Sequence, residues 1–239
     1  MTARPFATGH TEILRDWELA ISADMVLQRQ GANVRKVRAR QPRLVTLAER
    51  AIAEGQSLIQ PQVAYQVLRI KEAQRALVIL ENGEQLKGVT VARKLAGATF
   101  VVAVIATVGG KIEREMQRAT KEQAALGLAL DGYGSAAVGA LITGVRRYIA
   151  ERAQAAGLTT TTPLYPGTHG WELAAAQKEL FSLVNAAPIG VKLTSSFLMM
   201  PCKSVSMLIG AGMKLKSTDD DPCEECDAAT TCRYKSPNA

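Results

Sequence analysis

The chain has 239 residues, of which 47% are hydrophobic and 21% are charged, and its formal net charge is +7. This composition is typical of a soluble globular protein with enough chain for one sizeable core or two small ones. No charge-free apolar run reaches the roughly 20 residues that span a bilayer. The N-terminus also lacks the apolar core of a secretion signal, so we predict a cytoplasmic protein with no membrane segment.

Positive charge is densest in the stretch from Arg29 to Arg43. Clustered cations release counterions from phosphate, so a nucleic-acid interface is one interpretation. An acidic protein partner is another, because charge complementarity speeds encounter. No aromatic or recognition-helix pattern accompanies the charges, and we therefore favour a solvated loop surface over both partners.

Apolar spacing predicts two helices near the N-terminus. Residues 11–30 carry apolar side chains at helical spacing, and Gly31 is placed to end this helix as a C-cap. Residues 42–55 begin with Pro42, carry one apolar stripe and end at Gly55.

The next stretch has the pattern of an antiparallel sheet. Apolar and polar residues alternate over 63–67, and the apolar run 76–80 is followed by an Asn-Gly turn signal. A short helix is predicted over about 89–95. Residues 99–107 are β-branched almost throughout, which predicts a strand buried on both faces.

Two long helices are predicted in the middle of the chain, one ending at Leu126 and one over 128–156. The second contains DGYGSAAV, whose small residues let another backbone pack closely or leave room for a ligand. Asp131 is the candidate binding residue in this segment, with helix capping as its alternative role. A further amphipathic helix is predicted over 172–184.

Residues 187–213 contain the densest set of candidate site residues. Two short strands, 191–194 and 205–209, are predicted to be joined by a polar connection. Polar groups beside apolar walls are typical of a small-molecule site, and one of the two methionines is expected to face inward. The candidate binding residues here are Thr194, Ser195, Ser196, Met199, Met200, Lys203, Ser204 and Ser206.

A loop with a Pro-Gly turn precedes the helix predicted over 172–184. Pro166 and Gly167 are candidate binding residues, because a glycine in a turn lets the backbone approach a ligand closely. His169 is interpreted as an ordinary loop histidine and Trp171 as a packing anchor. We expect this loop and the polar connection to meet across one cleft.

Residues 219–239 form a cysteine-containing tail that we separate from the main domain, 1–218. The spacing C-x-x-C followed by a third cysteine predicts a thiolate site for zinc or an iron–sulfur cluster, with free or redox-active thiols as the alternative. The candidate metal ligands are Cys202, Cys223, Cys226 and Cys232.

The succession G-V-K-L-T-S-S-F-L-M-M-P-C-K-S-V-S at 190–206 resembles the activation (reactivation) domain of cobalamin-dependent methionine synthase, where the pattern is close to G-x-x-L-T-E-S-F-x-M-x-P-x-x-S-V-S. The segment L-D-x-x-G-S-A-A-V and the terminal C-x-x-C…C run are similar to free-standing, single-domain relatives. The resemblance covers roughly residue 22 to the end. It implies an α+β fold, a twisted antiparallel sheet flanked by helices.

The resemblance also implies a function. The protein is expected to dock on a corrinoid (cobalamin-carrying) protein or methyltransferase and assist its reductive reactivation. The electron would come through the cysteine site, and that reductive role favours iron–sulfur over zinc. The sequence shows no nucleophile–base pair, so whether the chain is itself an enzyme stays open.

The chain departs from the family at the loop that holds S-adenosylmethionine, which reads R-x-x-P-G-Y there. Pro163 stands in place of the arginine, Thr168 in place of the tyrosine, and Gly139 in place of an acidic residue. A proline cannot replace a bidentate arginine, so these departures count against S-adenosylmethionine as a ligand. Two alternatives stay open. One is a metal-binding redox or scaffold module without cobalamin, and the other is a protein that binds S-adenosylmethionine through other residues than those of the family.

Overall fold

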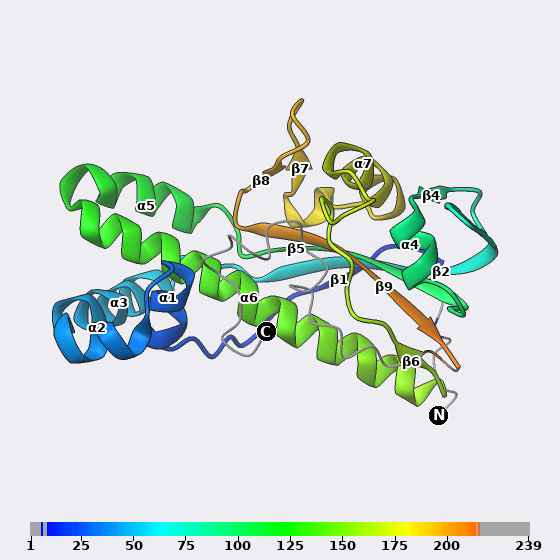
Figure 1. Cartoon of the computed structure of the whole chain (residues 1–239). Coiled ribbons are helices and arrows are strands. Elements are labelled where there is room, and N and C mark those ends of the chain that lie inside the picture. The colour runs from blue at the N-terminus through cyan, green and yellow to red at the C-terminus, as the bar shows by residue number, and fades with distance from the viewer. Residues whose placement is uncertain (1–5, 7–8, 214, 216–239) are drawn as a thin grey trace.

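The computed structural model describes Phe6, residues 9–213 and Leu215. A seven-stranded sheet runs through the molecule in the order β4-β3-β2-β5-β9-β6, with β1 also paired to β2, and every pairing is antiparallel (Figure 1). Its strands are β1 Glu12–Leu14, β2 Gln62–Gln74, β3 Leu77–Leu80, β4 Gln85–Lys87, β5 Phe100–Thr107, β6 Thr159–Thr160 and β9 Ser204–Gly212.

Helices cover both faces of this sheet. The long α6 crosses one face, and α1 and α3 pack on the part of α6 that extends past the sheet, while α4 and α7 lie on the other face (Figure 1). The helices are α1 Ala23–Arg29, α2 Val34–Arg40, α3 Pro42–Gly55, α4 Val89–Lys94, α5 Lys111–Glu122, α6 Ala124–Ala155 and α7 Leu173–Leu183, with a 3₁₀ turn at Ala187–Ile189. The fold class is therefore α+β, as predicted.

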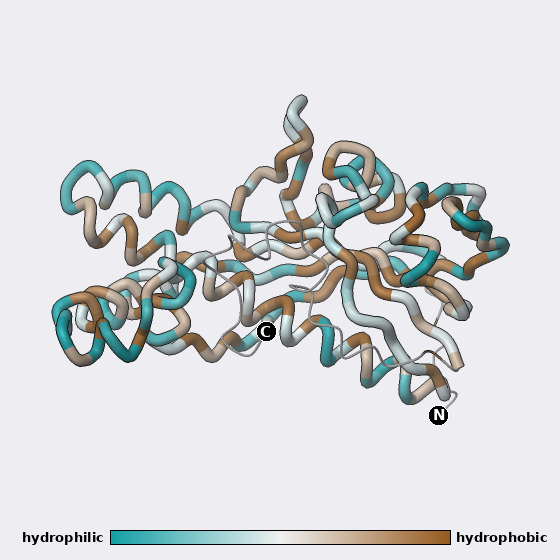
Figure 2. The backbone as a smooth tube through the Cα atoms, viewed as in Figure 1, coloured by the Kyte–Doolittle hydropathy of each residue, from teal (hydrophilic) through white to brown (hydrophobic). Residues whose placement is uncertain are grey.

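Strand β5 shows how the two faces are built. Successive side chains of a strand point to opposite faces. Val102 and Val104 join the core beneath α6, whereas Val101 and Ala103 join the core beneath α7. Apolar residues therefore follow one another along the strand, and the prediction of a strand buried on both faces is confirmed. Figure 2 shows the same contrast, with brown along the central strands and teal on the outer turns of α5.

Helix α6 packs closely on α1 because its small residues allow it. A Cβ added at Gly132 would lie 2.9 Å from the backbone oxygen of Val26. The prediction of close helix packing is confirmed. By length and hydropathy α6 is the one described helix that meets the criteria for a membrane span, but many of its side chains are buried against α1, α3, α5 and the sheet. A buried core helix passes the same test.

The helix predicted over 11–30 is wrong in its first half. Residues Glu12–Leu14 form β1, which pairs with β2, and the helix α1 starts only after the Ser22 N-cap. Tyr65 donates a hydrogen bond to Glu12, and Arg152 lies 3.0 Å from the same carboxylate. These tertiary contacts override the helical spacing.

The basic stretch predicted as a loop contains a helix. Asn33 caps α2 by accepting a hydrogen bond from the backbone N–H of Lys36 at 3.0 Å. Val37 is buried on the inner side of α2, while the basic side chains of Arg35 and Arg40 are exposed. The surface is solvated, as expected, but it is helical.

The predicted pairing within residues 187–213 is also wrong. The strand β9 pairs with β5 and β6, not with residues 191–194. Residues Lys192–Leu193 form β7 and pair with β8, Met199–Met200, in a small separate hairpin. Figure 1 shows this hairpin projecting away from the main sheet. The proposed tail at 219–239 lies outside the described residues.

Candidate functional site

Lys203 joins two segments that the sequence analysis singled out separately. Its Nζ lies 2.7 Å from Asp131 Oδ1 and 2.8 Å from Ser135 Oγ, both on α6. The Lys203 side chain is 15% exposed and that of Asp131 is 43% exposed. A Cβ added at Gly134 would come within 3.1 Å of Lys203 Cε, so the glycine makes room for the lysine stem. The lysine is thus held by α6, and Asp131 neutralises its charge in an ion pair.

The connection from the hairpin into β9 is fixed by hydrogen bonds. Ser204 Oγ donates to Pro201 O at 2.7 Å and lies 2.9 Å from Thr107 Oγ1. The backbone N–H of Lys203 donates to Glu113 Oε1 at 2.6 Å. Glu113 lies in the first turn of α5, where a carboxylate is favoured by the helix dipole. Ser204 therefore acts as part of the frame of the connection.

The hairpin itself presents apolar and polar groups to solvent. Thr194 Oγ1 accepts a hydrogen bond from Leu198 N at 3.1 Å, which closes the turn, and Ser195 and Ser196 are exposed at its tip. Leu198 is 57% exposed and Met200 39% exposed. The projecting hairpin therefore exposes both apolar and polar side chains.

Two other predicted residues point inward. Met199 packs against the core beneath α7, so the expectation that one of the two methionines faces in is confirmed. Ser206 is buried, and its hydroxyl donates to Gln177 Oε1 at 3.0 Å on α7. Ser206 is therefore satisfied within the protein and is not presented to a ligand.

Of the predicted metal ligands, Cys202 is the one within the described residues. It is exposed, and its Sγ lies 3.6 Å from Met200 Sδ. Cys223, Cys226 and Cys232 lie outside the described residues. Within the described part of the chain, no group of three or more His, Cys, Asp or Glu side chains is placed to hold a metal ion.

The Pro-Gly loop is anchored on the α7 side of the sheet. Gly167 has φ +87°, its N–H donates to Trp171 O at 3.0 Å, and its nearest side chain is that of Leu173. Trp171 is 1% exposed and donates to Glu179 Oε2 at 2.9 Å, which confirms it as a packing anchor. None of these contacts reaches the hairpin, so the single shared cleft stays a prediction.

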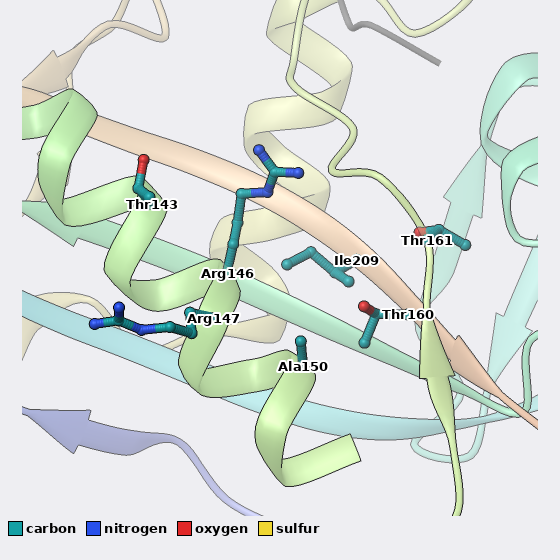
Figure 3. Close-up of a pocket in the computed structure, with 7 residues that line it drawn as sticks. All are labelled: Thr143, Arg146, Arg147, Ala150, Thr160, Thr161 and Ile209. Carbon is teal, nitrogen blue, oxygen red and sulfur yellow. The ribbon is translucent and has the colours of Figure 1, made fainter. Parts of the chain in front are cut away.

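A pocket that the sequence analysis missed lies between α6 and β6. Its volume is about 370 Å³, and Figure 3 shows the residues that line it. Arg146 and Arg147 leave α6 in different directions, and Thr160 and Thr161 lie across from the helix (Figure 3). The lining residues are Thr143, Arg146, Arg147, Ala150, Thr160, Thr161 and Ile209.

The surroundings of this pocket are basic. Burial raises the pKa of the nearby Tyr165, and the positive charges of Arg146 and Arg29 act in the opposite direction. Arg29 lies over α6, since a Cβ added at Gly139 would come within 2.6 Å of its guanidinium. The spacing of Thr143 and Arg147, one helical turn apart, is the sequence signal that would have marked this face of α6.

The arrangement defines an α+β protein with a curled antiparallel sheet, a helix that crosses one sheet face, and a projecting hairpin. A solved structure described as the MetH Reactivation Domain bound to AdoHcy is similar to this chain, with a TM-score of 0.61 and 12% sequence identity over 90% of this chain and 82% of that one. The chain therefore has the fold that its resemblance implied. No family model and no curated protein matches the sequence.

Proposed function

We propose that this protein is an accessory factor for the reductive reactivation of a corrinoid-dependent methyltransferase, and that it docks on the corrinoid protein through the β7–β8 hairpin. The observation that carries the proposal is the shared fold together with the position of residues 190–206. This segment bears the sequence resemblance, and its β7–β8 hairpin projects from the sheet with Leu198 and Met200 exposed. Exposed apolar groups at a projecting edge favour a protein partner.

The proposal assigns the Asp131–Lys203 pair a positioning role. Lys203 follows the hairpin directly, and its ammonium is tied to α6 at 2.7 Å. Rigid support of this kind lowers the entropy that docking would cost. By binding the corrinoid protein more tightly when the cobalt is in one redox state, this protein favours that state. The effect is a shift of population between redox states and needs no catalytic side chain.

Binding to an isolated corrinoid protein, measured anaerobically by calorimetry, tests the docking. Leu198→Ser and Met200→Ser should each weaken binding about ten-fold, because an apolar contact in an interface contributes about 1–2 kcal/mol. Leu44→Ser on α3, where the leucine is 38% exposed, is the matched control and should leave binding unchanged. Equal losses in all three variants, or no binding by the wild type, would contradict the proposal.

The source of the electron is a further part of the proposal, and it rests on the sequence. Thiolate ligands suit an iron–sulfur cluster or zinc. Protein purified anaerobically should contain iron that is lost in the Cys223→Ser, Cys226→Ser double variant. A colourless protein that contains zinc would overturn electron delivery and leave the docking proposal standing.

A second candidate function is the binding of an S-adenosyl ligand beside the Pro166-Gly167 turn. The AdoHcy bound by the MetH reactivation domain favours it. The positive charges of Arg29 and Arg146 act on Tyr165, the residue before this turn, and would repel a sulfonium placed beside it. We therefore expect S-adenosylhomocysteine, whose sulfur is neutral, to bind more tightly than S-adenosylmethionine. The reverse order in calorimetry would contradict this placement.

A further inference from the structure

The pocket between α6 and β6 has the chemistry of an anion site. Arg146 and Arg147 line it, with guanidinium groups that point in different directions (Figure 3), and none of the described residues lining it is acidic. Within the described part of the chain, neither arginine forms an ion pair. Guanidinium groups bind phosphate and carboxylate oxygens through paired N–H donors. Unpaired arginines that line one pocket therefore favour an anionic ligand.

The rest of the lining indicates what kind of anion fits. Thr160 brings a hydroxyl that makes no hydrogen bond to the described part of the chain. Ile209 and Ala150 add apolar surface to the pocket wall. The volume of about 370 Å³ falls within the range of small-molecule sites. An inorganic ion would leave the apolar wall uncovered, whereas a ligand with an organic part would cover it.

The charge balance separates a phosphate ester from a simple carboxylate. A single carboxylate would neutralise one of the two arginines, while a phosphate monoester carries close to two negative charges at neutral pH. Arg29, held over Gly139 on the same helix, adds a third positive charge near the pocket. A ligand with two negative charges therefore balances the positive charge around the pocket better than a ligand with one.

We propose that the α6–β6 pocket binds a small phosphate monoester with an organic group, such as a nucleoside monophosphate, through Arg146 and Arg147. The two exposed side chains turn toward the phosphate on binding, so that it accepts hydrogen bonds from their guanidinium groups and from the Thr160 hydroxyl. The organic part lies against Ile209. This site is independent of the hairpin, so it does not rest on the proposed corrinoid partner.

Calorimetry of the full chain with adenosine monophosphate, adenosine and inorganic phosphate tests the assignment. We expect adenosine monophosphate to bind, adenosine to bind at least about ten-fold more weakly, and rising salt to weaken the binding of the monophosphate. Inorganic phosphate should bind more weakly than the monophosphate, because it leaves Ile209 uncovered. Equal binding of adenosine and its monophosphate, or of phosphate and the monophosphate, would overturn the assignment.

Substitutions of the lining arginines test whether the ligand binds in this pocket. Arg146→Gln and Arg147→Gln should each weaken binding of the monophosphate about ten-fold. Both side chains are exposed, so the variants should keep the urea midpoint of the wild type. Arg35→Gln on α2 removes the same charge from another exposed helix and should leave binding unchanged. A loss in Arg35→Gln as large as in the pocket variants would show a general charge effect and overturn the site.

Discussion

Asp131 and Lys203 are buried to different extents, so removing one should cost more than removing the other. The Asp131 side chain is 43% exposed, whereas that of Lys203 is 15% exposed. Asp131→Ala leaves a largely buried ammonium that still donates a hydrogen bond to Ser135. Lys203→Met leaves a carboxylate that water can still solvate. The free energy of unfolding should therefore fall further in Asp131→Ala.

The size of the two effects follows from the degree of burial. Breaking a fully buried ion pair costs about 3–5 kcal/mol, and breaking an exposed pair costs about 0–1 kcal/mol. Asp131→Ala lies between these limits, at about 2 kcal/mol, because Ser135 still accepts a hydrogen bond. Lys203→Met should cost about 1 kcal/mol, since methionine keeps most of the stem that packs on Gly134. In a chain of this size, 1 kcal/mol corresponds to about 2–4 °C in Tm.

Urea unfolding of the two single variants and the double variant measures these values. The double variant should lose less stability than the two single losses added together, because the second change removes a charge that the first left unpaired. Asp24→Ala provides the control, since its partner Arg38 is 54% exposed and the expected loss is below about 0.5 kcal/mol. A Lys203→Met loss equal to or larger than that of Asp131→Ala would refute the reasoning.

Two further predictions concern the α7 side of the sheet. Burial raises the pKa of Glu179, against hydrogen bonds from Trp171 and the backbone, so the folded state binds this proton more tightly than the unfolded state. The stability gained from this tighter proton binding is present below the unfolded pKa of about 4.3 and is lost as pH rises through the folded pKa. Glu179→Gln should therefore be more destabilising at pH 4 than at pH 7 in urea unfolding. A loss that does not depend on pH would contradict this. Gly88→Ala places a Cβ 2.6 Å from the backbone oxygen of Gly170 at φ +144°, and should cost about 2–3 kcal/mol. Gly83→Ala, at φ +87° in open space, should cost only about 1 kcal/mol, and equal losses in thermal unfolding would show that backbone strain alone acts at both positions.

The elements that the sequence predicted well are those whose signals are local. Helix α3 begins at Pro42 and carries one apolar stripe, so its bounds depend on residues within the helix itself. The strand β5 is apolar at consecutive positions because it lies between two helical layers. Both patterns are complete within 14 residues or fewer, which is why they could be recognised without the fold.

The pairing of strands could not be predicted in the same way. Residues 191–194 and 205–209 both have strand character, and a short connection made a hairpin between them a reasonable expectation. In the structure Ser204 pairs with Thr107 and Ala211 with Phe100, so β9 takes β5 as its partner. The choice of partner depends on a strand about a hundred residues away in the sequence, and local alternation carries no information on it.

The candidate site was predicted in its parts but not in its contacts. Asp131 and Lys203 were each singled out, yet only the tertiary structure brings them to 2.7 Å. Arg146 and Arg147 were missed, because adjacent arginines on a helix are typical of a solvated face. Their significance depends on Thr160, which reaches the same pocket from β6.

The geometry of α6 keeps the two proposed sites apart. Asp131 and Arg146 are separated by 15 positions (146 − 131) on one continuous helix, which at a rise of 1.5 Å per residue is roughly 22 Å. A ligand that fills the α6–β6 pocket therefore does not reach the support of the hairpin at Lys203. Arg146→Gln should weaken nucleotide binding and leave corrinoid docking unchanged, while Leu198→Ser should do the reverse. If both variants weakened both activities, α6 would have to transmit a change along its length, and the two sites would be coupled through the helix.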